Sequence, residues 1–256
     1  MRLGMFMQPV HDPARNLTKV LEDDRETVKL ADQLGYHEVW VGEHTAATSE
    51  PITDPLVFLA TLIGETENIK LGTGVYCLPH HHPAQIAGQA ALFDHLSKGR
   101  FQMGVGNGSL SSDVELFEVG GDTDRGAMVC ESIEHILGIW AGDPPYDRGG
   151  EFWNVKIANV DRIEYGVGAF IKPYQQPHPP IAIPSCRPSP AARGSRVSLA
   201  GSRFREQHFF IRAIRLVIGR LTAKAPRKPA ATQIRIYGGY RAVLSSLRQT
   251  LKPVTM

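Results

Sequence analysis

The sequence predicts an α/β fold, a (β/α)8 barrel (TIM barrel) that is incomplete at its C-terminus. Two observations predict it. First, short apolar runs alternate with amphipathic helical segments from residue 2 to 185, a pattern typical of parallel strands with crossover helices. Second, the loop after the first run, QPVHDPARN, contains no glycine, whereas a doubly wound dinucleotide-binding sheet carries its glycine fingerprint there. The 256 residues, 42% of them hydrophobic, suffice for one such domain.

Each predicted strand is a short apolar run that ends in polar residues, Gly or Pro. In chain order these runs are 2–7, 38–44, 69–78, 101–106 and 179–185. The predicted helices lie between them, at 16–34, 54–66, 83–96 and 127–140. Gly35 ends the first helix, Asp54 and Pro55 begin the second, and Pro83 begins the third. Residues 143–179, rich in Gly, Pro and aromatic side chains, predict loops and a hairpin.

The C-terminal ends of the strands are where a barrel of this kind carries its chemistry. The candidate positions are therefore the residues that end each predicted strand. They are Met7 and Gln8, Gly42 to His44, Thr73 to Cys77, Gly106 to Ser109, and Pro184 with Ser185.

Three motifs occur in order at these positions: WVGEH, then LGTGVYCLPHHHP, then FDHLSKGRFQMGVGNG. Together they resemble the bacterial-luciferase-like, flavin-dependent monooxygenases, over residues 1 to about 186. The resemblance implies an oxidoreductase that binds reduced FMN at the barrel mouth. It further implies that this enzyme uses O₂, receives its flavin from a separate reductase, and oxygenates a small apolar organic substrate. In one branch of the superfamily the deazaflavin F420 replaces FMN, which implies hydride transfer without O₂ as the alternative.

The resemblance also assigns roles to individual residues. His44 matches a catalytic histidine, which Glu43 would position. Gly74 and Val75 match a bulge that packs under the flavin ring and often contains a non-proline cis peptide. The other cofactor-binding positions that it implies follow later strands: Asn107 and Gly108, then Ser185. Some relatives hold the phosphate with an arginine where this chain has Asn107, and Arg125 is the candidate substitute.

Three consecutive histidines, residues 80–82, raise the alternative of a metal site, because His80 and His82 have HxH spacing. A catalytic zinc site needs a third ligand and an open position. These histidines follow Leu78-Pro79, in a loop that leads into a helix, rather than lying on a strand. We therefore expect a polar loop that caps the helix, and no bound metal.

The three cysteines, at positions 77, 130 and 186, are widely spaced and predict neither a disulfide framework nor a zinc knuckle. No secretory signal and no apolar stretch of about 18 residues is present, so we expect a cytoplasmic protein without membrane contact. The sequence leaves a homodimer open.

The charge distribution divides the chain into residues 1–186 and 187–256. The first part holds 13 Lys and Arg against 25 Asp and Glu, and the second holds 15 against one, Glu206. We interpret 187–256 as an atypical tail, the product of a frameshift, because a GC-rich gene read out of frame yields such an Arg-, Ala- and Pro-rich mixture. A genuine basic extension that binds polyanions, on a catalytically incompetent barrel, is the alternative, although nucleic acid is not the partner we expect.

Overall fold

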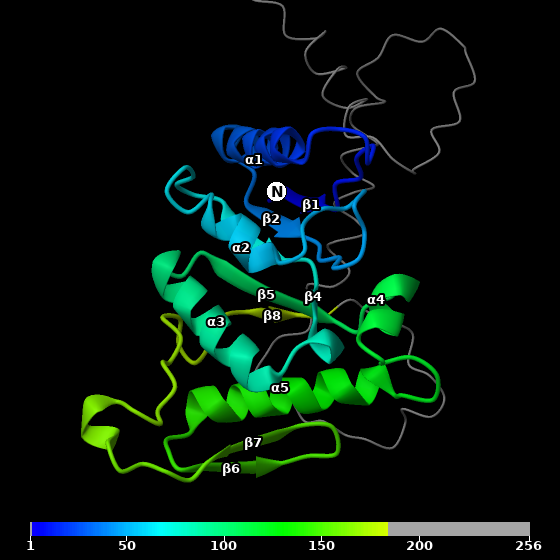
Figure 1. Ribbon diagram of the computed structural model, residues 1–256. Helices are drawn as coiled ribbons and strands as arrows, with labels where there is room; N and C mark the ends of the chain where they lie inside the picture. The colour runs from blue at the N-terminus through cyan, green and yellow to red at the C-terminus, as the bar shows by residue number, and fades with distance from the viewer. Residues whose placement is uncertain (1, 184–256) are drawn as a thin grey trace, which may run out of the picture.

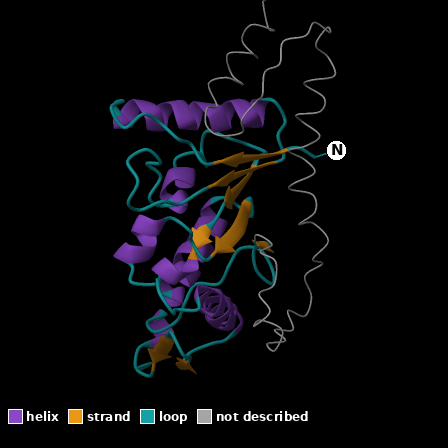
Figure 2. Cartoon of the chain, turned by 90° about the vertical axis from the view of Figure 1, so that its right-hand side faces the viewer, coloured by secondary structure: helices purple, strands orange, loops and turns teal. Residues whose placement is uncertain are grey.

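The computed structural model describes residues 2–183, which form one parallel sheet with helices along one side (Figures 1 and 2). The strands lie in the order β1, β2, β3, β5, and both β4 and β8 pair with β5, every pair being parallel. This confirms the α/β barrel architecture. The strands are β1 (Gly4–Met7), β2 (Glu38–Val41), β3 (Lys70–Thr73), β4 (Tyr76–Cys77), β5 (Phe101–Gly106) and β8 (Ile181–Ala182).

The helices begin where the sequence supplies a cap. Asn16 caps α1 (Leu17–Gln33) by accepting from the Lys19 backbone N–H, and Asp54 caps α2 (Pro55–Ala60) in the same way. The other helices are α3 (Pro83–Leu96), α4 (Ser111–Leu116) and α5 (Arg125–Ala141), with short 3₁₀ turns η1 (Leu78–His80) and η2 (Ile163–Tyr165). Their apolar faces pack on the buried side of the strands and form one core.

Three elements differ from their predictions. Helix α2 ends at Ala60 rather than at residue 66, because the next residues form i to i−3 hydrogen bonds and the Thr61 hydroxyl donates to the Phe58 carbonyl. The predicted strand 69–78 is divided into β3 and β4. Helix α4 was not predicted. The hairpin predicted within 143–179 is confirmed as β6 (Tyr146–Gly149) paired with β7 (Asn154–Ile157).

Trp40 of β2 occupies a space that three glycines leave open. A Cβ at Gly72 would lie 2.6 Å from Trp40 Cε3, one at Gly74 would lie 2.8 Å from its Cβ, and one at Gly104 would lie 3.1 Å from its Cζ3. Only 7% of Trp40 is exposed. The indole therefore fills the space where these strands carry no side chains, consistent with the packing role that the sequence suggests.

Gly104→Ala is expected to lower the free energy of unfolding by about 2 kcal/mol, because the new methyl group would overlap the Thr73 carbonyl oxygen. Thr73 is fixed there, since its hydroxyl donates to the Gly104 carbonyl and accepts from the Gly104 N–H. Urea unfolding measures the change. Gly88→Ala is the control, because nothing lies within 4 Å of a Cβ there; alanine should stabilise α3 by about 0.5 to 1 kcal/mol. Equal stability of the two variants would contradict this packing.

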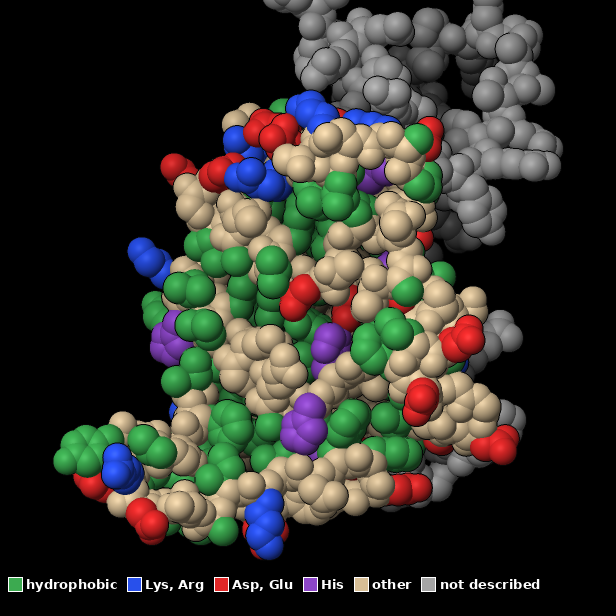
Figure 3. Space-filling view, in the orientation of Figure 1, with side chains coloured by type: hydrophobic (Ala, Val, Ile, Leu, Met, Phe, Trp, Pro, Cys, Tyr) green, Lys and Arg blue, Asp and Glu red, His purple; other side chains and the backbone are tan. Residues whose placement is uncertain are grey.

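Charged side chains cover α1, at the top of Figure 3, where Lys19 and Lys29 pair with neighbouring carboxylates. Apolar side chains are exposed instead on α2 and α3: Val57, Leu92 and Leu96. Within residues 2–183, no helix is both long and apolar enough to cross a membrane. Ser185 and the basic tail lie outside the described residues.

Candidate active site

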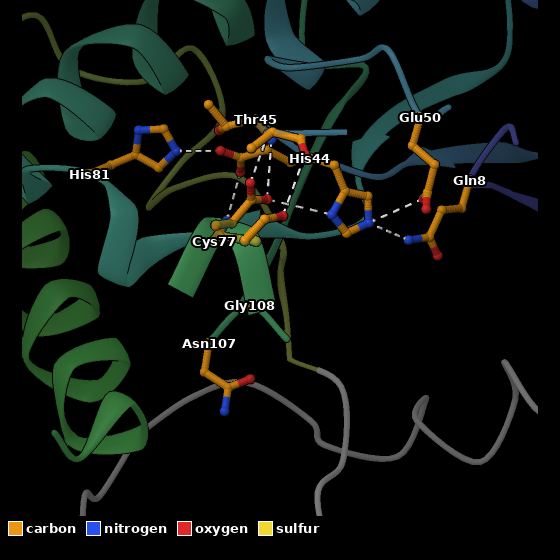
Figure 4. A network of polar contacts seen from close by, with 12 residues as sticks. Gln8, His44, Thr45, Glu50, Cys77, His81, Asn107 and Gly108 are labelled. Atoms are coloured by element: carbon orange, nitrogen blue, oxygen red, sulfur yellow. Dashed lines mark hydrogen bonds and ion pairs between the residues drawn. The ribbon is translucent and has the colours of Figure 1, made fainter. Parts of the chain in front are cut away.

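The C-terminal ends of β1, β2, β3 and β5 lie at one edge of the sheet. Figure 4 shows residues of the loops at this edge, among them Gln8, His44 and Asn107. Two backbone hydrogen bonds continue the sheet there: Gly42 N–H donates to the Met7 carbonyl, and Gly74 N–H donates to the Val41 carbonyl. The predicted residues His44, Gly74 and Asn107 therefore lie on neighbouring segments of one edge.

His44 lies in the loop after β2, with 14% of its side chain exposed. Its Nε2 atom lies 2.5 Å from Gln8 Nε2 and 3.2 Å from Glu50 Oε2, and its Nδ1 atom lies 3.6 Å from Asp113 Oδ2. With the Gln8 amide assigned as the donor to Nε2, the neutral ring carries its proton on Nδ1, facing Asp113. A second proton at Nε2 would face Glu50. The ring thus lies between the Gln8 amide and the carboxylates of Glu50 and Asp113.

A pocket of about 10 Å³ opens beside this ring, enough for about one water molecule. Residues from the loops that follow β1 and β2 line it. They are Gln8, Pro9, Gly42, His44, Glu50 and Ile52.

Asp113 holds the loop that carries His44. Its buried carboxylate, on α4, accepts from the backbone N–H groups of Thr45 and Ala46, at 3.1 and 2.7 Å. Sequence reasoning missed this residue, because its partners are 67 and 68 positions away and α4 was itself unpredicted. Glu50 was missed as well, since it lies in the loop rather than at the strand end.

Glu43 has partners other than the one we expected. Its buried carboxylate points away from His44: Oε2 accepts from the Cys77 backbone N–H at 2.8 Å, and Oε1 lies 2.5 Å from His81 Nε2. Glu43 therefore joins the loop after β2 to β4 and η1. The carboxylates that face His44 come from Glu50 and Asp113 instead.

The peptide bond between Gly74 and Val75 is cis, as the resemblance implies. The reason for glycine at position 74 differs from the expected approach of a flavin ring, because a Cβ there would meet the side chains of Trp40 and Phe6. Val75 has its side chain against Gly106, where a Cβ would lie 2.7 Å from Val75 Cγ2. The bulge thus lies directly beside the loop after β5.

That loop contains Asn107 and Gly108, and Arg125 holds it. Arg125 Nη1 donates to the carbonyl oxygens of Gly108 and Asn107, at 2.8 and 3.4 Å. Gly108 has φ +66°, a left-handed conformation that favours glycine. The guanidinium therefore brings positive charge to the loop where the sequence lacks an arginine.

The three consecutive histidines have three different environments. His80 is buried against Gly108 and stacks on Phe117, His81 pairs with Glu43, and His82 caps α3 by accepting from the Ala84 N–H. Nowhere in residues 2–183 do three or more His, Cys, Asp or Glu side chains converge as a metal site would require. The sequence predicted that this loop caps the following helix, and His82 does so.

Comparison with known sequences matches residues 1–205 to the luciferase-like monooxygenase family. The chain is 39% identical over 158 residues to 4-hydroxyprotoasukamycin monooxygenase from Streptomyces nodosus subsp. asukaensis, covering 61% of this chain and 42% of the relative. It is 32% identical over 192 residues (74% and 50%) to the oxygenase component of the flavin-dependent trigonelline monooxygenase of Acinetobacter baylyi. It is 36% identical over 174 residues (66% and 45%) to limonene 1,2-monooxygenase from Rhodococcus erythropolis. The chain spans about half the length of the curated relatives it matches.

Solved structures have the same fold. The oxygenating constituent of 3,6-diketocamphane monooxygenase from Pseudomonas putida, in complex with FMN, superimposes with a TM-score of 0.66 at 24% identity, covering 72% of this chain and 51% of that one. The F420-dependent tetrahydromethanopterin reductase of Methanopyrus kandleri gives 0.54 at 18% identity, covering 72% and 50%. At these identities the likeness concerns the fold alone.

Proposed function

Because this chain belongs to the luciferase-like monooxygenase family, we propose that its barrel mouth binds reduced FMN and uses O₂ to oxygenate a small apolar organic substrate. The observation that carries the proposal is the position of His44, held between Gln8, Glu50 and Asp113 at the edge where the Gly74–Val75 bulge and the Asn107–Gly108 loop meet. Only the barrel topology brings these segments together.

The residues of the mouth fit the parts of FMN. The isoalloxazine ring is flat and apolar, and the Gly74–Val75 bulge offers it the half-buried valine side chain. The phosphate is an anion, and the Asn107–Gly108 loop carries the Arg125 guanidinium. When bound, reduced FMN supplies the two electrons with which one atom of O₂ enters the substrate and the other leaves as water.

The protein itself supplies proton handling and exclusion of water. His44 can accept a proton at Nε2, where Glu50 faces it, and return the proton to the reacting groups. Buried side chains behind it, including Trp40, Ile52 and Leu78, keep the interior of the mouth dry. Ser185, beyond the described residues, remains our prediction for a second phosphate contact.

We propose FMN rather than F420 because flavin-dependent monooxygenases are among the relatives at 30% identity or more, whereas the F420-dependent reductase shares only the fold. The trigonelline enzyme is one component of its system. By analogy we propose that a separate reductase delivers reduced flavin to this chain in the cytoplasm. Limonene, a hydrocarbon and the substrate of another relative, is the first test substrate.

We also propose a homodimer. Val57 of α2 and Leu92 and Leu96 of α3 are 67%, 52% and 53% exposed and belong to helices that contact each other. Adjacent exposed apolar side chains are typical of protein interfaces. Sedimentation velocity measures the mass in solution, and a monomer at all concentrations would contradict the proposal.

An anaerobic titration with reduced FMN tests the cofactor. We expect saturable binding in the micromolar range, about 8 kcal/mol of binding free energy, and clearly weaker binding of reduced F420. Flavin fluorescence and equilibrium dialysis measure both. Admission of ¹⁸O₂ with limonene should then give a product that carries one labelled oxygen. Failure of the folded chain to bind reduced FMN, or turnover that needs F420 and no O₂, would overturn the proposal.

A further inference from the structure

His80 is a buried histidine whose ring nitrogens have no hydrogen-bond partner within residues 2–183. Only 8% of the residue is exposed, and both Nδ1 and Nε2 are fully enclosed. Its ring stacks on Phe117, with the ring centroids 4.5 Å apart and the planes inclined by 14°. Buried polar groups in folded proteins nearly always have partners, so two enclosed nitrogens without one indicate a missing ligand.

The position of the ring identifies where that ligand would lie. A Cβ at Gly108 would be 2.9 Å from both Cε1 and Nε2 of His80. The imidazole edge therefore faces the backbone of the loop that Arg125 holds. Val75 packs on Gly106, two residues earlier in the same chain segment. His80 thus lies next to the segment that connects the proposed ring site to the proposed phosphate site.

The ring is neutral near pH 7. The pKa of His80 is lowered to about 4, chiefly by burial and also by the charges on His81, Arg125 and His44, while the charge on Asp113 opposes the shift. A neutral imidazole offers one N–H donor and one acceptor nitrogen. A hydroxyl group can pair with either nitrogen, because it can accept from the N–H or donate to the acceptor nitrogen. A phosphate dianion only accepts, and an apolar substrate does neither.

We propose that His80 binds a hydroxyl group of the polyhydroxylated chain between the ring and the phosphate of the flavin. The inference rests on the proposed function, since it needs a flavin in the mouth. It assigns His80 to binding the chain, Arg125 to the charge beside the phosphate, and His44 to proton transfer.

Three reduced flavins separate the parts of the cofactor: lumiflavin has the ring alone, riboflavin adds the hydroxylated chain, and FMN adds the phosphate. The variant is His80→Phe, which keeps the stack on Phe117 and removes both polar nitrogens. His80→Asn restores a donor and an acceptor, and His37→Phe, at the far end of β2, is the matched control. Anaerobic titrations give the affinity of every variant for each flavin, and circular dichroism reports folding.

We expect His80→Phe to lower the affinity for riboflavin and for FMN about tenfold each, and to leave the affinity for lumiflavin unchanged. His80→Asn should retain part of the lost affinity. Loss of FMN affinity alone would assign His80 to the phosphate, and unchanged affinities would remove it from the binding site; either result overturns the inference while the proposed function stands. If His80→Phe does not fold, equal affinities of His80→Asn and His80→Ala for riboflavin overturn it. Absence of flavin binding by the wild type overturns both.

Discussion

Replacing His44 with alanine is expected to slow oxygenation of the substrate by about a hundredfold or more, while the affinity for reduced FMN changes less than about twofold. His44 is the one histidine at this edge whose ring lies against two carboxylates, Glu50 and Asp113, and beside a small pocket. Losing it removes the group that exchanges a proton and leaves the cofactor contacts in place. Single-turnover mixing of the reduced, flavin-loaded protein with O₂ and limonene gives the rate of product formation.

The matched control is His37→Ala, because His37 immediately precedes the same strand but at its opposite end. We expect its single-turnover rate to match that of the wild type. If a His44→Ala protein binds flavin and oxygenates limonene at the wild-type rate, His44 has a structural role and not a catalytic one.

Replacing Glu43 with alanine is expected to lower the free energy of unfolding by about 3 kcal/mol. The carboxylate is buried and has two partners, the Cys77 backbone N–H and the His81 ring. Truncation leaves a buried backbone donor without an acceptor and separates the loop after β2 from β4. Urea unfolding followed by circular dichroism measures the loss.

Two comparisons test this explanation. Glu26→Ala, on the exposed side of α1, should change stability by less than about 0.5 kcal/mol. In a double-mutant cycle, Glu43→Ala and His81→Ala should be clearly non-additive, because the two side chains contact each other. Additive losses would show that the Glu43–His81 pair contributes nothing, and a Glu43→Ala protein as stable as Glu26→Ala would contradict the structure around position 43.

The sequence predicted the elements whose signals are local. Asn16 and Asp54 mark the starts of α1 and α2 because a cap acts on residues two or three positions away, and Pro83 marks the start of α3 because proline suits the first helical position. The early end of α2 was missed. Hydrogen bonds from side chains to the backbone end this helix, and the spacing of apolar residues does not indicate such bonds. Helix α4 was missed because it has six residues, too few for a periodic pattern.

The meeting of the candidate positions at one edge was predicted where the barrel rule applies, and the long-range contacts between them were not predicted. His44, Gly74 and Asn107 could be chosen because strand ends of a barrel converge. Asp113 and Glu50 could not, since nothing near them in the sequence indicates that a loop after β2 will lie against them. The role of Glu43 was assigned from its neighbour in sequence, yet its carboxylate points to residues 34 and 38 positions away.

The glycines around Trp40 have a consequence for how this barrel can change in evolution. Gly72 and Gly74 lie on one stretch of chain at the end of β3, and Gly104 lies on β5. A Cβ at Gly72 or Gly104 would contact the indole ring of Trp40, and one at Gly74 would contact its Cβ. At Gly72 the three nearest atoms all belong to the indole ring, so a methyl group gained there requires a smaller residue at position 40. At Gly104 the Thr73 carbonyl oxygen is the nearest atom, and at Gly74 it is the Trp40 Cβ, so a smaller residue 40 would not make room at either position. Divergence here should therefore couple positions 40 and 72, whereas positions 74 and 104 should remain glycine whatever the size of residue 40.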